Sequence, residues 1–145
     1  MTSVITIHDN PSPADVEAVD SGLDTANDEA RVLQDVRPLA AFAREAGELV
    51  GGAVGRTWGE CCELQYLWVR TEDRRRGLGL RLLHAFEQRA RERGCNRVYL
   101  ETFSFQAPAL YAAQGYRVAF ELHGYTHAVG KFLMIKELAK RDGVR

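Results

Sequence analysis

Consecutive arginines and two glycines stand where an apolar run gives way to a helical pattern. The stretch consists of Arg74, Arg75, Arg76, Gly77, Leu78, Gly79 and Leu80. The N-terminus of a helix presents backbone N–H groups without partners and the positive end of the helix dipole. Glycine lets an anion approach the backbone, and arginine donates paired hydrogen bonds to phosphate oxygens. Residues 74–80 therefore predict a phosphate-binding loop.

Two common phosphate-binding motifs do not fit this loop. A Walker A loop continues from its second glycine with Lys and then Ser or Thr, whereas Leu80 and Arg81 follow Gly79. A dinucleotide fingerprint needs a third small residue, and Leu82 stands there. The remaining pattern is Arg/Gln-x-x-Gly-x-Gly/Ala after an apolar strand. The alternative interpretation is a basic helix start on a solvated surface.

Hydrophobic periodicity predicts the elements that position this loop. Strands are expected at residues 4–8, 38–44, 48–55, 62–69, 97–103, 116–125 and 127–138, the last two forming a hairpin. Helices are expected from Pro13, over about 77–93 and over 108–113, and the polar segment up to Val36 is either a second helix or a loop. The strand–helix–strand run from 62 to 103 implies a right-handed crossover with parallel pairing. The core-facing stripe of its helix is expected to hold Leu78, Leu82, Ala85, Phe86 and Arg89, with Leu83 and Ala90 at the border.

Length and composition predict one globular domain spanning residues 1–145, because 46% of the residues are hydrophobic and 27% are charged. No apolar run is long enough to span a bilayer, and the N-terminus lacks the pattern of a signal peptide. The cysteines are Cys61, Cys62 and Cys95, a spacing that suits neither a zinc site nor a disulfide framework. We therefore expect no membrane partner, no metal and a cytoplasmic location.

Charge is unevenly distributed along the chain. Residues 1–63 hold 12 acidic and 4 basic side chains, and residues 64–145 hold 8 acidic and 15 basic ones. Either the chain has two solvated surfaces of opposite sign, or one site holds an anion on one side and a cationic partner on the other. A single arginine cluster at a helix start fits a pyrophosphate better than a nucleic acid, which needs a spread basic surface.

In this order of elements the chain resembles the GNAT superfamily of N-acetyltransferases, small single-domain bacterial type. Residues 74–79 are similar to its pyrophosphate-binding loop for acetyl-coenzyme A, and residues 67–69 to the strand end that pairs with the pantetheine arm. Residues 107–116 resemble its second signature, a short helix with a tyrosine followed by a Gly-Tyr/Phe strand start. The resemblance implies the α/β (α+β mixed sheet) GNAT acyl-CoA N-acyltransferase fold. That fold has a mostly antiparallel central sheet, one strand–helix–strand crossover and helices on both faces.

The resemblance also implies the activity and a set of cofactor-binding residues. The activity is acetyl transfer from acetyl-CoA to a primary amine of a small molecule or peptide, by direct attack in a ternary complex. The cofactor-binding residues implied are Leu67, Trp68, Val69, Arg74, Arg75, Arg76, Gly77, Leu78, Gly79, Leu80, Ser104 and Tyr111. Ser104 stands where the family often has asparagine, and Gln106 is the alternative contact there.

Two side chains are the expected catalytic residues. Tyr111 matches the tyrosine that hydrogen-bonds the coenzyme A sulfur and protonates it, and Glu63 matches the family's glutamate base. The backbone N–H of Val69 would polarise the thioester carbonyl. Glu101 or a water chain is the competing base. The plainer alternatives are an aromatic ring packed on the sheet and a solvent-facing strand carboxylate.

The acceptor and the assembly are read from the ends of the chain. In the family the first helices and the last hairpin shape the acceptor site, and here residues 13–36 are acidic, which favours a cationic amine. Apolar residues 132–135 of the hairpin favour a homodimer through an exposed edge. The alternative function is a non-catalytic sensor or regulatory module that binds acetyl-CoA.

Overall fold

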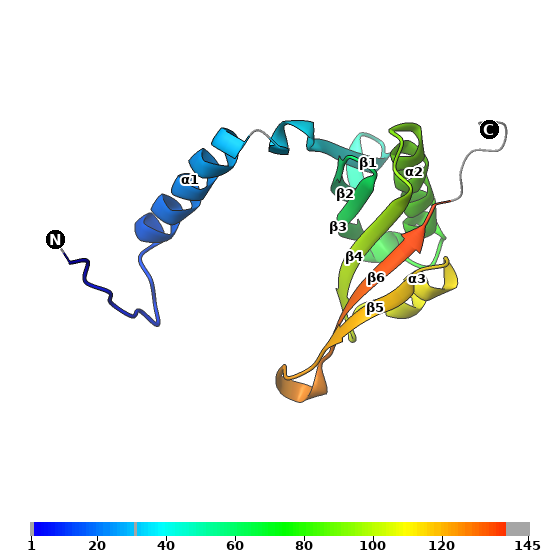
Figure 1. The fold of residues 1–145 in the computed structure, drawn as a ribbon. Coiled ribbons are helices and arrows are strands. Elements are labelled where there is room, and N and C mark those ends of the chain that lie inside the picture. The colour runs from blue at the N-terminus through cyan, green and yellow to red at the C-terminus, as the bar shows by residue number, and fades with distance from the viewer. Residues whose placement is uncertain (1, 31, 139–145) are drawn as a thin grey trace. The chain divides into compact units, whose positions relative to one another are not determined.

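The computed structural model describes residues 2–30 and 32–138 (Figure 1). The chain divides into two compact units, Met1–Asp35 and Val36–Arg145, called unit 1 and unit 2 below. Unit 1 contains helix α1 (Pro13–Ala30) and the short 3-10 helix η1 (Val32–Asp35). Unit 2 contains every strand found in the described residues and the remaining helices.

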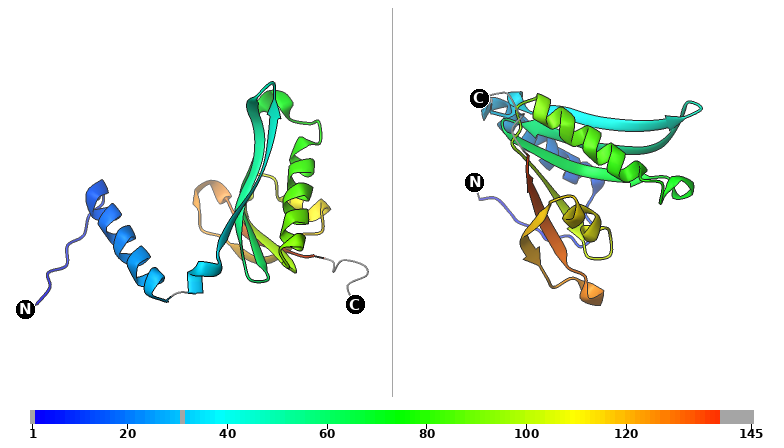
Figure 2. Two further views of the ribbon diagram at one scale, coloured as in Figure 1. Left: turned by 90° about the horizontal axis from the view of Figure 1, so that it is seen from above. Right: turned by 90° about the vertical axis from the view of Figure 1, so that its right-hand side faces the viewer.

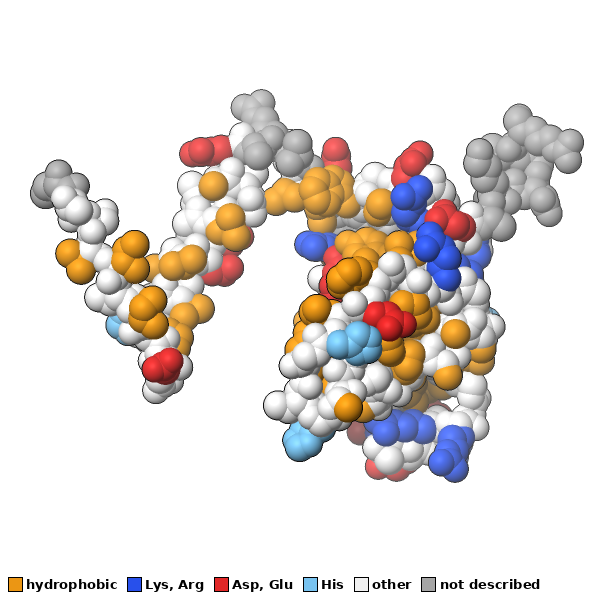
Figure 3. Space-filling view, turned by 60° about the horizontal axis from the view of Figure 1, so that its bottom comes forward, with side chains coloured by type: hydrophobic (Ala, Val, Ile, Leu, Met, Phe, Trp, Pro, Cys, Tyr) orange, Lys and Arg blue, Asp and Glu red, His pale blue; other side chains and the backbone are white. Residues whose placement is uncertain are grey.

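In unit 1 the helix is as expected and the first strand is not. Helix α1 starts at Pro13, and the N–H of Val16 donates to the carbonyl of Ser12 at 3.1 Å. The expected strand at 4–8 is wrong, because residues 2–8 adopt no regular structure. A strand needs a neighbour for its N–H and C=O groups, and the described part of unit 1 contains no other strand. Apolar side chains along α1 are exposed (Figure 3).

The sheet of unit 2 is built from all the strands of the described residues. These are β1 (Arg37–Glu45), β2 (Glu48–Trp58), β3 (Cys61–Val69), β4 (Arg97–Phe103), β5 (Arg117–Leu122) and β6 (Lys131–Glu137). Their order across the six-stranded sheet is β1-β2-β3-β4-β6-β5. The β3–β4 pair is parallel, and the other neighbouring pairs within the described residues are antiparallel. The expected mostly antiparallel mixed sheet with one strand–helix–strand crossover is confirmed.

Strands β3 and β4 pair over only part of their length. Their register runs from Cys61↔Arg97 to Leu64↔Leu100 and ends there. Beyond this point β3 stays paired with β2 as far as Val69, and β4 stays paired with β6 as far as Phe103. The two central strands therefore separate, and a gap opens inside the sheet.

A β-bulge lies at the beginning of this gap. Gly55 pairs with Leu64 and Val54 pairs with Tyr66, so Gln65 is an extra residue in β3. A Cβ on Gly55 would lie 1.8 Å from the carbonyl oxygen of Glu63, so only glycine fits opposite the bulge. The bulge shifts the alternation of β3 by one residue.

Helices α2 (Leu78–Glu92) and α3 (Pro108–Ala113) lie on the same side of the sheet (Figure 2). Of the helices expected on both faces, the described part of unit 2 contributes these two on one face, because α1 belongs to unit 1. The buried residues of α2 are Leu82, Leu83, Phe86, Glu87 and Ala90. The expected stripe is therefore corrected, because Ala85 and Arg89 are exposed while a glutamate is buried.

The face of the sheet away from α2 and α3 carries large apolar side chains. Exposed aromatic residues of the strands include Phe42, Trp58, Tyr66, Trp68 and Phe120. Every residue of β5 is exposed, and β5 is the edge strand of the sheet. The apolar run 132–135 lies on β6, between β4 and β5, so the exposed edge is at β5 and not at 132–135.

Candidate active site

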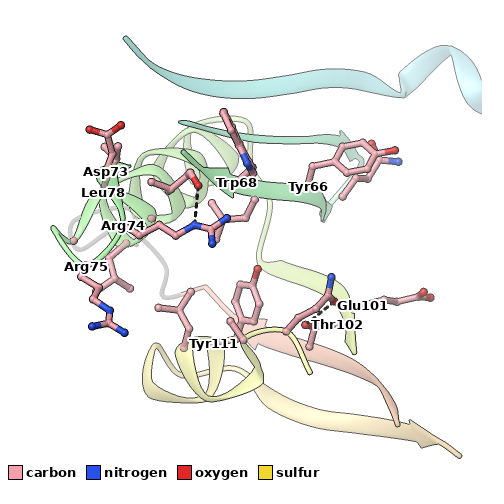
Figure 4. A pocket seen from close by; sticks show the side chains of 18 residues that line it. Tyr66, Trp68, Asp73, Arg74, Arg75, Leu78, Glu101, Thr102 and Tyr111 are labelled. Carbon is pink, nitrogen blue, oxygen red and sulfur yellow. Dashed lines mark hydrogen bonds between the residues drawn. The ribbon is translucent and has the colours of Figure 1, made fainter. Parts of the chain in front are cut away.

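A cavity of about 840 Å³ in unit 2 opens where β3 and β4 separate (Figure 4). Its walls come from the end of β3, the end of β4, the loop and first turn of α2, and helix α3. The lining residues are Gln65, Tyr66, Leu67, Trp68, Val69, Asp73, Arg74, Arg75, Gly77, Leu78, Gly79, Leu80, Glu101, Thr102, Gln106, Ala107, Leu110 and Tyr111. Most of the residues expected to bind a cofactor therefore surround one space.

The loop between β3 and α2 is fixed by hydrogen bonds at its base. Arg70 donates from its backbone N–H to the carbonyl of Val50 at 2.8 Å, and its Nε donates to the carboxylate of Asp73 at 2.7 Å. Asp73 is buried, on the 3-10 helix η2 (Thr71–Asp73). Burial of this paired carboxylate anchors the loop before the arginine run begins.

The arginine run turns sharply into helix α2. Arg75 and Gly77 have φ of 65° and 73°, in the left-handed region. The first helical hydrogen bond runs from the N–H of Arg81 to the carbonyl of Gly77, at 3.1 Å. The N–H groups of residues 78–80 therefore lack helical partners, and all three residues line the cavity. The first turn of α2 holds no acidic residue, so these free N–H groups and the helix dipole favour an anion. We call residues 78–80 the anion cradle.

The three arginines are placed differently. Arg74 lines the cavity, and its Nε donates to the carbonyl of Val69 at 3.0 Å (Figure 4). Arg75 also lines the cavity. Arg76 is outside the lining; its side chain is 70% exposed, and its guanidinium lies 3.9 Å from the carboxylate of Asp73. The left-handed turn at Arg75 is what separates Arg76 from its two neighbours.

The end of β3 provides the apolar wall and one free backbone donor. Leu67, Trp68 and Val69 line the cavity as expected. The N–H of Arg70 points to β2, where it bonds Val50. Successive N–H groups of a strand point to opposite sides, so the N–H of Val69 points away from β2 into the gap. The N–H of Val69 is therefore a backbone donor that faces the gap.

Tyr111 projects from α3 into the cavity, toward β3 (Figure 4). Its side chain is 9% exposed, and burial raises the pKa of its phenol above the usual value of 10. Its ring packs edge to face on that of Tyr116, with ring centroids 5.7 Å apart. Tyr111 is therefore protonated at physiological pH, and it shares the cavity with the end of β3.

Glu63 lies outside this cavity. It lines a second, smaller cavity of about 340 Å³ together with Arg56, Trp58, Gly59, Cys61 and Tyr99. Its carboxylate accepts from Arg56 Nε at 3.0 Å and from the hydroxyl of Tyr99 at 3.1 Å. Both partners stand directly opposite Glu63 in the register of the sheet. Burial and the adjacent carboxylate raise the pKa of Tyr99. The structure thus does not bring Glu63 and Tyr111 into one cavity.

Hydrogen bonds decide whether Ser104 or Gln106 lines the cavity. Ser104 is outside the cavity lining, because it forms two bonds with Gly130: its N–H donates to the carbonyl at 2.8 Å, and its hydroxyl accepts from the N–H at 3.0 Å. Gln106 lines the cavity, and its Oε1 accepts from the N–H of Phe103 at 2.8 Å. The amide nitrogen of Gln106 is the polar group left for a ligand.

Glu101, the competing base, reaches the cavity but is paired. Its carboxylate accepts from Lys131 Nζ at 2.7 Å and extends away from Tyr111 (Figure 4). Sequence reasoning missed other lining residues: Gln65, Tyr66, Asp73, Thr102, Ala107 and Leu110. For Asp73 the sequence signal was its position directly before the arginine run.

The described residues contain neither a cluster of metal-ligating side chains nor a membrane-spanning helix. Within 2–30 and 32–138, no three His, Cys, Asp or Glu side chains gather so that they could hold a metal ion. Over the same residues, no helix combines the length and the apolar character needed to cross a membrane.

Comparison with known proteins identifies similar chains. Residues 4–116 match the model of the Acetyltransferase (GNAT) family. A blasticidin-S acetyltransferase from Streptomyces morookaense is 39% identical over 130 residues, which are 80% of this chain and 96% of that protein. A crystal structure of an acetyltransferase from Bacillus cereus ATCC 14579 has a TM-score of 0.72 at 26% identity, covering 92% of this chain and 98% of the other.

A more distant structure was solved with the cofactor bound. This Bacillus anthracis str. Ames protein, in complex with acetyl coenzyme A, has a TM-score of 0.62 at 18% identity, covering 70% of this chain and 63% of the other. At this level of identity the similarity is one of fold.

Proposed function

The chain belongs to the GNAT family of acetyltransferases, and from this premise we propose which residues bind acetyl-CoA, which one protonates the leaving thiolate and which amines accept the acetyl group. As a member, the chain is an acetyl-CoA-dependent N-acetyltransferase that acts on an amine. One observation carries the finer proposal. A single cavity joins the basic loop at 74–80, the apolar end of β3 and the buried Tyr111.

The cavity fits the parts of acetyl-CoA in sequence. The diphosphate would lie on the free N–H groups at the start of α2, next to Arg74 and Arg75. The pantetheine arm would follow Leu67, Trp68 and Val69 along the gap, with the amide of Gln106 opposite. We leave Arg76 and Ser104 out of this contact set, because both lie outside the cavity lining.

Each step of the transfer has a candidate group. The neutral amine attacks the thioester carbon, so a C–N bond forms and the C–S bond breaks. The carbonyl oxygen gains charge near the N–H of Val69. The thiolate leaves and takes the proton of Tyr111. The amine's proton goes to a base, which is Glu63 or Glu101, directly or through water. Glu63 would need water to bridge from its own cavity, and Glu101 would need to leave Lys131.

We propose that the acceptor is a small cationic amine. The basic lining residues, Arg74 and Arg75, are at the cofactor loop. The wall formed by β4 carries Glu101, whose carboxylate would have to exchange Lys131 for the amine. The Streptomyces relative is named for blasticidin S, so that compound is the first acceptor to test, together with polyamines, aminoglycosides and lysine peptides. Equal kcat/KM for neutral and cationic amines would refute the charge argument. A turnover-free sensor is less favoured, because the relatives named above are acetyltransferases.

Gly79 offers a direct test of the cofactor site. A Cβ here would meet only Val69 Cγ2, at 3.8 Å, so a side chain fits without strain. Gly79→Glu places a negative charge at the diphosphate and should weaken acetyl-CoA binding by more than about tenfold in calorimetric titration. Gly79→Gln has the same size without the charge and should bind more tightly than Gly79→Glu. Equal affinity of the two variants would place the diphosphate elsewhere.

Tyr111→Phe tests the proton donor. We expect kcat to fall by about 100-fold, with the KM for acetyl-CoA little changed. Because burial raises the pKa of Tyr111 above 10, the phenol stays protonated at pH 7–9. The wild-type kcat should therefore fall only above pH 10, where the phenol loses its proton. The kcat of Tyr111→Phe should show no such fall. A wild-type rate insensitive to this substitution would remove Tyr111 from the chemistry.

Domain organisation, oligomeric state and location complete the proposal. We propose that residues 1–145 act as one acetyltransferase domain, since the family match at 4–116 includes parts of both units. We propose a homodimer formed along β5, whose apolar residues Val118, Phe120 and Leu122 are exposed at the sheet edge. Light scattering of wild type and Phe120→Lys would test it. The free cysteines support a cytoplasmic location.

A further inference from the structure

A carboxylate is buried in the middle of α2, on the same side of the helix as buried leucine and phenylalanine side chains. Glu87 is 1% exposed. A buried carboxylate is costly unless other groups pair with it, and a buried ion pair is seldom more stable than an apolar pair of the same volume. Stability alone therefore gives little reason for a glutamate here.

Glu87 is paired with two side chains from other parts of unit 2. The hydroxyl of Tyr116 donates to its Oε2 at 2.7 Å. Lys136 on β6 donates from Nζ to both oxygens at 3.1 Å, and the same Nζ lies 5.6 Å from the centre of the Tyr116 ring. We call Glu87, Tyr116 and Lys136 the buried cluster. It joins α2, the turn after α3, and β6.

The buried cluster reaches the cavity through one ring. Tyr116 packs edge to face on Tyr111, with centroids 5.7 Å apart, and its N–H donates to the Tyr111 carbonyl at 3.0 Å. Within the described part of the chain, no hydrogen bond holds the Tyr111 hydroxyl, so packing must orient it. Helix α3 has only six residues and cannot hold its own shape without tertiary contacts.

We propose that the buried cluster holds the ring of Tyr111 in the position from which its hydroxyl reaches the leaving sulfur. This inference rests on the role proposed for Tyr111 above. Tyr116 and Glu87 are positioning residues, because they act through Tyr111 and do not line the cavity themselves. Glu87 also belongs to the helix whose first turn forms the anion cradle. The buried cluster therefore sets the distance between the cofactor's diphosphate and the acid that acts on its sulfur.

Tyr116→Phe separates this role from simple packing, because the ring remains and Glu87 keeps Lys136. We expect kcat to fall by about 5- to 20-fold and the KM for acetyl-CoA to change by less than about twofold. A double-mutant cycle with Tyr111→Phe supplies the decisive comparison. In the Tyr111→Phe background no hydroxyl remains to be positioned, so adding Tyr116→Phe should change kcat by less than about twofold.

His84→Ala is the matched control. His84 Nε2 is hydrogen-bonded to Gln114 Oε1 at 2.8 Å, which also links α2 to the end of α3, but this bond is on the exposed surface. We expect kcat to be unchanged in this variant. If it falls as far as in Tyr116→Phe, any loosening of α3 suffices and the buried cluster has no special role. Urea unfolding of each variant gives the folded fraction by which kcat is normalised.

Fluorine NMR provides a readout that does not depend on activity. With 3-fluorotyrosine incorporated, the Tyr111 signal is identified by its loss in Tyr111→Phe. It should shift or broaden in Tyr116→Phe and remain in place in His84→Ala. An unchanged signal, or equal kcat losses for Tyr116→Phe in both backgrounds, would overturn the proposal. If Tyr111→Phe alone leaves kcat unchanged, the catalytic assignment of Tyr111 fails, and this inference fails with it for that separate reason.

Discussion

Replacing Arg75 by glycine should stabilise the free protein and lower its affinity for acetyl-CoA. Arg75 has a φ of 65°, which costs an L-residue about 1–2 kcal/mol. Glycine removes that strain but adds about 0.5–1 kcal/mol of chain entropy to the unfolded state. The net gain lies between about 0 and 1.5 kcal/mol, and its middle value of about 0.7 kcal/mol corresponds to an increase of about 2–5 °C in Tm for a unit of this size.

The effect on binding has the opposite sign. Arg75 lines the cavity at the anion cradle, and one exposed charge-assisted hydrogen bond contributes about 1 kcal/mol. Its loss should raise the Kd for acetyl-CoA by about fivefold to tenfold. Differential scanning fluorimetry without ligand and calorimetric titration with acetyl-CoA measure the two effects separately, at one ionic strength because exposed charges are screened by salt.

Arg76→Gly is the matched control for this prediction. Arg76 has no left-handed strain to relieve and lies outside the cavity. Its replacement should lower Tm by about 2–4 °C through chain entropy and leave Kd within about twofold. A lower Tm for Arg75→Gly would refute the strain reasoning, and an unchanged Kd would show that its guanidinium does not touch the cofactor.

Two further predictions concern stability and thiol reactivity. Gly55→Ala should lower Tm by more than about 10 °C, because its Cβ would lie 1.8 Å from the carbonyl oxygen of Glu63 and the bulge would have to move. Gly79→Ala, which meets ordinary contacts, should not destabilise, and equal Tm values would contradict the close approach. At pH 8 iodoacetamide should label Cys61 alone in the native protein, because Cys62 is buried with its pKa raised to about 12 and Cys95 is also buried. Mass spectrometry should show all three labelled in urea, and native labelling of Cys95 would contradict the buried position.

The parts of the site that depend on short segments could be predicted from the sequence. The loop at 74–80 carries its own signal, since glycine and arginine at a helix start are residue types that favour an anion. Helix α3 has the predicted bounds, because Pro108 opens it and Gly115 follows its end. The crossover followed from strand, helix and strand lengths alone.

The features that escaped prediction depend on contacts between distant segments. A bulge at Gln65 changes which side chains of β3 share a face, and the strand pattern gives no sign of it. Ser104 and Gln106 are two residues apart, and only the bonds of Ser104 to Gly130 decide which one faces the cavity. Glu87 looks solvent-facing in a helical pattern, because its partners lie 29 and 49 residues further along the chain.

The separation of β3 from β4 also has a consequence for local opening of the native structure. Past Leu64 the sheet has an internal edge, so amide groups at the end of β3 have no strand on one side. A pantetheine arm with two amides would act as the missing strand there, and binding would complete the hydrogen-bond ladder. The ligand then becomes part of the fold, and it stabilises the native state by RT ln(1 + [L]/Kd). Hydrogen–deuterium exchange at residues 66–69 should slow when acetyl-CoA is added. The amides that slow should be those of β3 that the ligand pairs in place of a strand.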